Sequence, residues 1–194
     1  MASNPPATRK MKVVCVFGSY DSNKGQALYE QAYALGRALA EAGYTLANGG
    51  YGGTMEAGAR GAKDAGGRTI GVTCQRFAGR GKRRPRANRW IDEEIRRDDP
   101  LERIRTMIEL SSAYVALPGG TGTLTELAVA WEYVCKRLIQ PRPIFLLGEF
   151  WRPVAEPILA LRPREGRHLH FVDEPAQIIA ALNAPAVGTP ADSR

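Results

Sequence analysis

Apolar runs that end at glycine alternate with segments of helical periodicity along this 194-residue chain. The first run, Val13–Phe17, holds no polar residue and ends at Gly18-Ser19, which is typical of a strand buried on both faces. Similar runs predict strands at 44–48, 69–73, 113–117, 143–147 and 169–172. Helical spacing predicts helices at 25–42, 55–65, 100–111, 121–136, 152–162 and 176–182. The alternation predicts an α/β fold: a doubly wound parallel sheet of about six or seven strands with helices on both faces.

The predicted helices carry their own start signals. Thr54 is expected to cap the second helix, and Asp98 or Asp99 the third, in which Pro100 takes the first helical position.

Composition favours one globular domain. Hydrophobic residues make up 44% of the chain and charged residues 24%, which excludes a disordered protein. We expect a single domain at 11–184, between a disordered tail at 1–10 and a flexible tail at 185–194. Three widely spaced cysteines and the lack of a secretory or membrane-spanning apolar run favour a cytoplasmic protein. No cofactor is expected, and two alternating histidines, His168 and His170, are too few for a metal site.

Three glycine-rich turns follow predicted strands, at 18–19, 49–53 and 119–122. In doubly wound sheets ligands bind beyond the carboxyl ends of the strands, where the strand order reverses. The binding site is therefore predicted at this edge.

The most informative stretch, Pro118–Glu126, reads PGGTGTLTE and lies between a predicted strand and a predicted helix. Glycines allow backbone N–H groups to approach an anion, and the helix start adds unpaired donors with a partial positive charge. Thr121 and Thr123 add hydroxyl groups. These features predict a phosphate cradle. The stretch is neither a P-loop, because no lysine follows the last glycine, nor a dinucleotide fingerprint, because Thr125 replaces the third glycine.

Glu126 would lie one turn into the helix, beside the ligand of the cradle. Two interpretations stay open: a functional carboxylate paired with Arg103 on the preceding helix, or an acid that only stabilises the helix start.

A basic segment accounts for the net charge of +7. Seven cations and no acid lie within residues 76–89, namely Arg76, Arg80, Lys82, Arg83, Arg84, Arg86 and Arg89. Such a segment suits a phosphorylated small molecule, or is a solvated loop or an oligomer contact. Nucleic acid is a weaker alternative, because no aromatic residues are interleaved for stacking.

Residues 118–126 match the PGGxGTxxE signature of the Lonely Guy (LOG) family, the cytokinin riboside 5′-monophosphate phosphoribohydrolases once labelled lysine decarboxylases. The resemblance extends over about 11–183 and includes Phe17-Gly18-Ser19, the Gly49-Gly50 turn with Gly53-Thr54-Met55, and Arg103. It implies a Rossmann-like fold, a homodimer and a catalytic pair formed by Arg103 and Glu126. The nucleotide-binding residues it places on this chain are Gly18, Ser19, Gly49, Gly50, Met55, Gly119, Gly120, Thr121, Gly122 and Thr123.

The activity implied is hydrolysis of the N-glycosidic bond of N6-modified adenosine 5′-monophosphates, giving a free base and ribose 5-phosphate. A carboxylate near the anomeric carbon would stabilise developing positive charge and accept a proton from water. Glu94 is a further candidate for a base or ribose contact. Ile104 follows Arg103 where the family commonly has lysine, and the turn at 52–56 resembles a branch that includes molybdenum cofactor carriers. The alternative is therefore a non-catalytic carrier of a phosphorylated ligand. We expect a small-molecule partner, no membrane and no nucleic acid.

Overall fold

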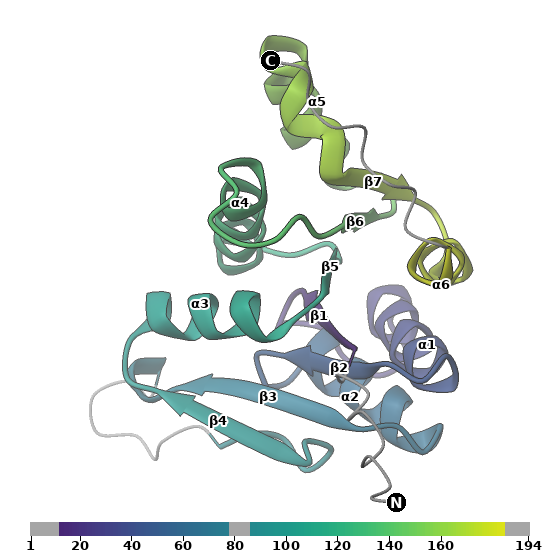
Figure 1. Cartoon of the computed structure of the whole chain (residues 1–194). Coiled ribbons are helices and arrows are strands. Elements are labelled where there is room, and N and C mark those ends of the chain that lie inside the picture. Colours follow the sequence, from purple (N-terminus) through teal and green to yellow (C-terminus); the bar gives the residue numbers. More distant parts are fainter. Residues whose placement is uncertain (1–11, 78–85, 185–194) are drawn as a thin grey trace, which may run out of the picture.

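The computed structural model describes residues 12–77 and 86–184, and both predicted tails lie outside them. One sheet of seven parallel strands runs through these residues in the order β4-β3-β2-β1-β5-β6-β7 (Figure 1). The strands are β1 (Val13–Phe17), β2 (Thr45–Asn48), β3 (Thr69–Cys74), β4 (Glu93–Arg97), β5 (Ala113–Ala116), β6 (Ile144–Leu147) and β7 (Leu169–Val172). The predicted α/β fold is confirmed.

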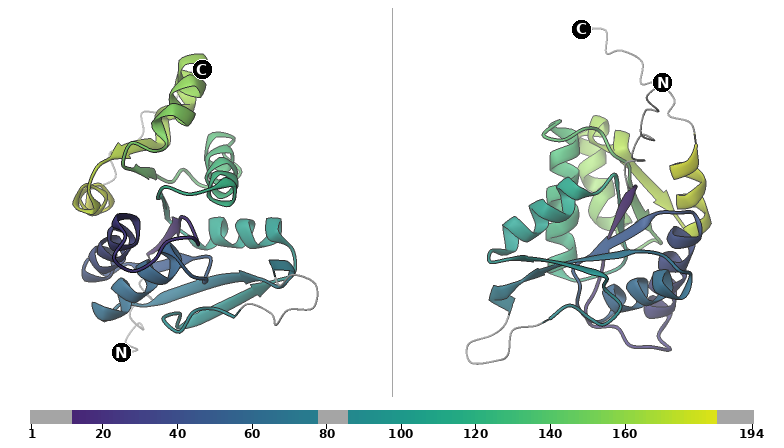
Figure 2. Two further views of the ribbon diagram at one scale, coloured as in Figure 1. Left: turned by 180° about the vertical axis from the view of Figure 1, so that it is seen from behind. Right: turned by 60° about the horizontal axis from the view of Figure 1, so that its bottom comes forward.

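Within the described residues, five α-helices connect strands and a sixth follows β7, and together they cover both faces of the sheet. They are α1 (Ala27–Glu41), α2 (Thr54–Asp64), α3 (Pro100–Leu110), α4 (Thr121–Cys135), α5 (Arg152–Leu161) and α6 (Pro175–Asn183), with short 3₁₀ turns η1 (Gln75–Phe77) and η2 (Pro163–His168). Helices α1, α2 and α6 pack on one face, and α3, α4 and α5 on the other (Figures 1 and 2). No helix in these ranges is long and apolar enough to cross a bilayer.

Strand β1 lies at the centre of the sheet, between β2 and β5. Its side chains alternate between two cores: Cys15 and Phe17 pack under α3 and α4, whereas Val14 and Val16 pack under α1. Burial on both faces explains why the strand reads as a continuous apolar run. The strand order reverses between β1 and β5, so the turns after these strands meet at the switch point.

Strand β4 was not among the strands predicted from the sequence. Its residues, Glu-Glu-Ile-Arg-Arg, carry four charges because the strand forms an exposed edge of the sheet and pairs only with β3.

The structure also corrects one helix cap. Gly53 is the N-cap of α2, and the Thr54 hydroxyl instead donates to the Ser19 carbonyl at 2.9 Å. In α3 the Asp99 carboxylate accepts from the N–H groups of Leu101 and Glu102, so Asp99 rather than Asp98 is the cap, ahead of Pro100.

Helices α1 and α2 cross in close contact on their face of the sheet. A Cβ added to Gly36 of α1 would overlap the carbonyl group of Gly58 of α2. Glycine at this position therefore lets the backbones of α1 and α2 approach each other closely.

We predict that Gly36→Val lowers the free energy of unfolding by about 3 kcal/mol, because backbone atoms cannot make room for the new side chain. Urea denaturation measures this loss. Ala34→Val, at an exposed position of the same helix, is the matched control and should cost less than about 1 kcal/mol. Equal losses in both variants would contradict the close crossing.

Candidate functional site

Arg103 is a buried cation at the carboxyl edge of the sheet. Helix α3 carries its side chain inward, where only 5% of the residue is exposed. The guanidinium donates from Nε to the Val72 carbonyl at 2.7 Å and from Nη1 to Glu126 Oε1 at 2.9 Å. A buried charge needs such partners, so the pair fixes α3, β3 and α4 relative to one another.

Glu126 is the buried partner of Arg103, as the sequence suggested. It lies in α4 and is 8% exposed. Burial raises the pKa of its carboxyl, while the charge and hydrogen bond of Arg103 oppose that rise.

Cys15 of β1 is buried in the core under α3 and α4. Burial raises the pKa of its thiol, and the charge of Glu126 adds to the rise. Cys15 therefore stays protonated and is a core residue, not a nucleophile.

The Gly49-Gly50 turn lies against the guanidinium. A Cβ on Gly49 would overlap Nη2 of Arg103 and crowd the sulfur of Met55, so a larger residue here would displace the guanidinium from its present position. Gly50 has a φ of 78° and donates its N–H to Oδ1 of Asn48 at 2.8 Å. The amide of Asn48 in turn donates to the Met55 carbonyl, which ties the turn to the start of α2.

Asn88 holds the same turn from the other side. Its backbone N–H donates to the Gly50 carbonyl at 2.7 Å, and its side-chain amide donates to the carbonyls of Gly50 and Tyr51. This role of Asn88 could not be predicted, because nothing in the local sequence pattern indicates a contact with a residue 38 positions away.

Two aromatic rings border the buried cation. The guanidinium carbon of Arg103 lies 5.7 Å from the ring centroid of Tyr51 and 5.5 Å from that of Phe77. Both contacts stabilise the cation. The Tyr51 hydroxyl is fixed by Cys74, whereas Phe77 remains half exposed. Neither residue was predicted from the sequence, although an aromatic residue inside a glycine-rich turn is a signal that could have indicated Tyr51.

The turn after β1 lies next to the start of α2 at the carboxyl edge of the sheet. The Ser19 carbonyl accepts from the N–H of Thr54 at 2.8 Å as well as from its hydroxyl, and a Cβ on Gly18 would overlap that hydroxyl. Gly18 and Ser19 therefore lie against the start of α2.

The predicted cradle lies at the start of α4. The N–H groups of Thr121, Gly122 and Thr123 donate to no acceptor within the described residues. Gly120, Thr121 and Gly122 are exposed, and a Cβ on either glycine would meet open space. Thr123 is buried against Gly119. The free donors, together with the positive end of the helix, can bind an anion.

Trp151 supports the strand end that leads into the cradle. Its indole is fully buried and donates to the Leu117 carbonyl at 3.0 Å. Thr123 and Glu126 are three residues apart in α4 and so lie on one side of the helix. The cradle and the buried carboxylate are therefore neighbours.

Glu94 lies on β4 and is already engaged. Its carboxylate accepts from Arg96 at 2.8 Å, from the Thr73 hydroxyl at 2.8 Å and from the N–H of Ala87 at 3.3 Å. The hydrogen bond from Arg96, followed by those from Thr73 and Ala87, lowers the pKa of this carboxyl.

The basic segment is only partly described. Arg80, Lys82, Arg83 and Arg84 lie outside the described residues, whereas Arg76, Arg86 and Arg89 lie inside them. Within those same ranges no three His, Cys, Asp or Glu side chains are grouped as metal ligands.

The model of the SLOG cluster4 family matches residues 11–179. The chain belongs to the SLOG cluster4 family. Membership in this LOG-type family confirms the resemblance carried by residues 118–126.

Named relatives of this SLOG cluster4 protein include two cytokinin riboside 5′-monophosphate phosphoribohydrolases. The enzyme of Mycobacterium tuberculosis is 40% identical over 105 residues, which are 54% of this chain and 54% of that protein. The enzyme of Rhodococcoides fascians is 31% identical over 148 residues, 74% of this chain and 72% of that protein. The chain thus spans only about half the length of the Mycobacterium tuberculosis relative.

Among solved structures, the molybdenum cofactor carrier protein of Chlamydomonas reinhardtii matches with a TM-score of 0.68 and 28% identity, over 89% of this chain and 96% of that one. The molybdenum cofactor binding protein of Rippkaea orientalis matches with a TM-score of 0.72 and 24% identity, over 90% and 97% of the two chains. The second likeness shows a shared fold.

We predict that Arg103→Met makes the stability of this SLOG cluster4 protein strongly pH-dependent. Without the cation, burial alone sets the pKa of Glu126, and that pKa rises further. Folding then favours the protonated carboxyl, so the unfolding free energy is highest below the ordinary glutamate pKa and falls as the pH rises through the raised value.

Urea denaturation between about pH 5 and about pH 8 tests this, with a loss relative to wild type that grows to about 3–5 kcal/mol at the alkaline end. The double variant Arg103→Met/Glu126→Gln is the control and should lack the added pH dependence. A loss of the same size at every pH would argue against an uncompensated carboxylate.

Proposed function

We propose that this protein is a hydrolase of adenosine 5′-monophosphates, including N6-modified ones, that releases the free base and ribose 5-phosphate. The observation that carries the proposal is the buried Arg103–Glu126 pair, 2.9 Å between Nη1 and Oε1, next to the unpaired donors at the start of α4. The names of the relatives from Mycobacterium tuberculosis and Rhodococcoides fascians support the same reaction.

In the proposed mechanism the 5′-phosphate binds the N–H groups of Thr121, Gly122 and Thr123. This contact is remote from the bond that breaks, so its binding energy can hold the anomeric carbon near the reacting groups. Gly119 and Gly120 keep side chains away from the phosphate.

Glu126 is the proposed catalytic carboxylate. As the bond between C1′ and the base nitrogen lengthens, positive charge develops on the sugar, and a nearby carboxylate stabilises it. Glu126 also accepts a proton from the attacking water, whose oxygen bonds to C1′. The leaving base nitrogen takes up a proton from solvent as its bond to C1′ breaks, and Glu126 then returns its proton to solvent. Burial raises the pKa of the Glu126 carboxyl, which makes it a better proton acceptor than a solvated glutamate.

Arg103 has two proposed roles. It fixes one carboxylate oxygen of Glu126 and opposes protonation of the resting enzyme. Its remaining donors can contact substrate oxygens.

The other proposed ligand contacts come from Gly18, Ser19, Gly49, Gly50 and Met55 at the same edge. Glu94 can contact a base or ribose only by exchanging one of its present hydrogen bonds. A homodimer and the absence of nucleic-acid binding stay predictions.

A second candidate function is that of a carrier for a phosphorylated ligand. The likeness to the molybdenum cofactor carrier protein of Chlamydomonas reinhardtii, over 96% of that chain, favours it. Incubation with AMP and N6-isopentenyladenosine monophosphate separates the two functions: a hydrolase releases free base, whereas a carrier binds without turnover.

We predict that Glu126→Gln keeps AMP binding and lowers the rate of base release by about 10²–10⁴-fold, because the amide keeps the shape but neither holds negative charge nor takes a proton. Arg103→Ala should also lower turnover. Chromatographic detection of free base measures both rates. Glu132→Gln, on the exposed side of α4, is the matched control and should keep the parent rate. An unchanged rate in Glu126→Gln would exclude the assigned role.

We predict that Gly120→Asp raises the KM for AMP at least about tenfold, because a carboxylate at the cradle repels phosphate. Gly120 has a φ of −87° and open space beside it, so a side chain fits without strain. Gly120→Asn has nearly the same shape without the charge and should change KM much less. Steady-state kinetics compares the two, and equal KM values would place the phosphate elsewhere.

A further inference from the structure

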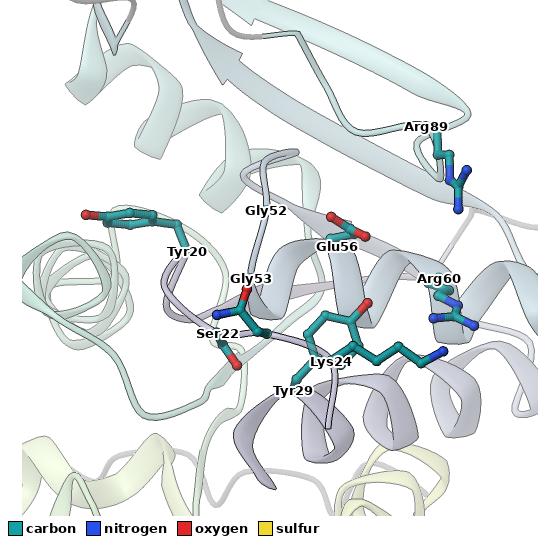
Figure 3. A pocket seen from close by; sticks show the side chains of 10 residues that line it. Tyr20, Ser22, Lys24, Tyr29, Gly52, Gly53, Glu56, Arg60 and Arg89 are labelled. Atoms are coloured by element: carbon teal, nitrogen blue, oxygen red, sulfur yellow. The ribbon is translucent and has the colours of Figure 1, made fainter. Parts of the chain in front are cut away.

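A second pocket, of about 640 Å³, lies beside the turn after β1 and helices α1 and α2. Its size is that of pockets which bind small molecules, roughly 300–1,000 Å³. Figure 3 shows Tyr29 projecting from α1, and Glu56 and Arg60 projecting from α2. None of Arg103, Glu126 and residues 119–123 lines it, so it is separate from the proposed active site.

Positive charge gathers at this pocket from three segments. Lys24 comes from the turn after β1, Arg60 from α2 and Arg89 from the segment before β4, against one lining carboxylate, that of Glu56. Within the described residues, no ion pair involves Lys24 or Arg89. A concave surface with uncompensated cations attracts anions.

Trp90 holds two of these cations in place. The guanidinium carbon of Arg89 lies 4.8 Å from its ring centroid, and that of Arg60 lies 5.8 Å from it. Two guanidinium groups on one indole repel each other. An anion bound by both would relieve that repulsion and use donors that are already positioned.

Two polar atoms at the pocket lack hydrogen-bond partners. Ser22 is 6% exposed and its hydroxyl is unpaired, as is Nε of Arg60, whose carboxylate neighbour Asp64 is 3.7 Å away. The closer contact of Asp64 is the Tyr33 hydroxyl, at 2.9 Å. Buried donors without partners are costly, so a ligand that supplies acceptors would be favoured.

We propose that this pocket binds a phosphorylated small molecule of sugar-phosphate or mononucleotide size. Arginine forks match the oxygens of a phosphoryl group, and Arg60, Arg89 and Lys24 supply the charge. Glu56 and Tyr29 then face the rest of the ligand, where a carboxylate accepts from sugar hydroxyls but rejects a second anion. The proposal does not depend on hydrolysis at Glu126.

Two indole N–H groups allow each site to be followed separately in ¹H–¹⁵N NMR spectra of the full chain. Trp90 reports on the second pocket, and Trp151, bonded to the Leu117 carbonyl, reports on the cradle. The probes are inorganic phosphate, ribose 5-phosphate, AMP and adenosine. We expect Trp90 to shift saturably with AMP and ribose 5-phosphate but not with adenosine.

Arg89→Gln and Arg60→Gln should each weaken the affinity read at Trp90 about tenfold or more, which corresponds to one charged hydrogen bond. Arg105→Gln removes the same charge from an exposed ion pair on α3 and should change nothing. If inorganic phosphate binds as tightly as ribose 5-phosphate, the result would support an anion site at this pocket and would identify free phosphate as its ligand.

No shift of Trp90 up to about 10 mM ligand, a shift with adenosine, or equal affinity in wild type and both variants would overturn the proposal. A shift of the Trp151 signal alone would contradict ligand binding at this pocket and would be consistent with the proposed hydrolase. A shift of Trp90 without one of Trp151 would support this pocket and count against the cradle.

Discussion

A guanidinium held inside the protein constrains everything around the carboxyl edge of the sheet. Arg103 needs acceptors because an uncompensated buried charge costs several kcal/mol. It finds them in the Val72 carbonyl and in Glu126, with the Tyr51 and Phe77 rings beside it. This arrangement requires glycine at position 49, the approach of α3 to β3, and the first turns of α4 close by. The same contacts that stabilise the fold therefore place a carboxylate beside a helix start whose first N–H groups have no acceptor among the described residues.

Features governed by local patterns could be predicted from the sequence. Strand β1 is apolar because both faces are buried, and Asp99-Pro100 starts α3 because side-chain and ring geometry suit a helix start. The meeting of Arg103 and Glu126 was also within reach, since both elements lead to or from the switch point. The burial of this pair could not be predicted, because it depends on contacts of Arg103 with Gly49 and Val72. The spacing of Arg103 and Glu126 in the sequence gives no information on these contacts.

Features governed by distant contacts were missed. Strand β4 lacks an apolar run because it forms an edge, so its pairing with β3 leaves no periodic signal. Asn88 looks like part of a basic segment, yet its amide holds the backbone of Gly50 and Tyr51. The cations within residues 76–89 form one continuous basic segment in the sequence, but Arg76 and Arg89 have different partners in the structure. Arg76 in fact pairs with Asp99, whereas Arg89 lies on Trp90.

The Gly49–Gly53 turn lies between the two sites and contacts both. Gly49 packs on the Arg103 guanidinium, whereas Gly52 and Gly53 line the second pocket. Asn88, which ties this turn down, directly precedes Arg89 in the chain. The segment that carries Arg89 is therefore the one whose Asn88 amide holds the backbone of Gly50 and Tyr51. Such an arrangement couples two sites only to the extent that the ligand binds one position of the turn better than another. The turn itself is fixed by the hydrogen bond from the Gly50 N–H to Oδ1 of Asn48 and by that from the Asn88 amide to the Tyr51 carbonyl, so the contacts that it makes on its two sides are set by one backbone arrangement.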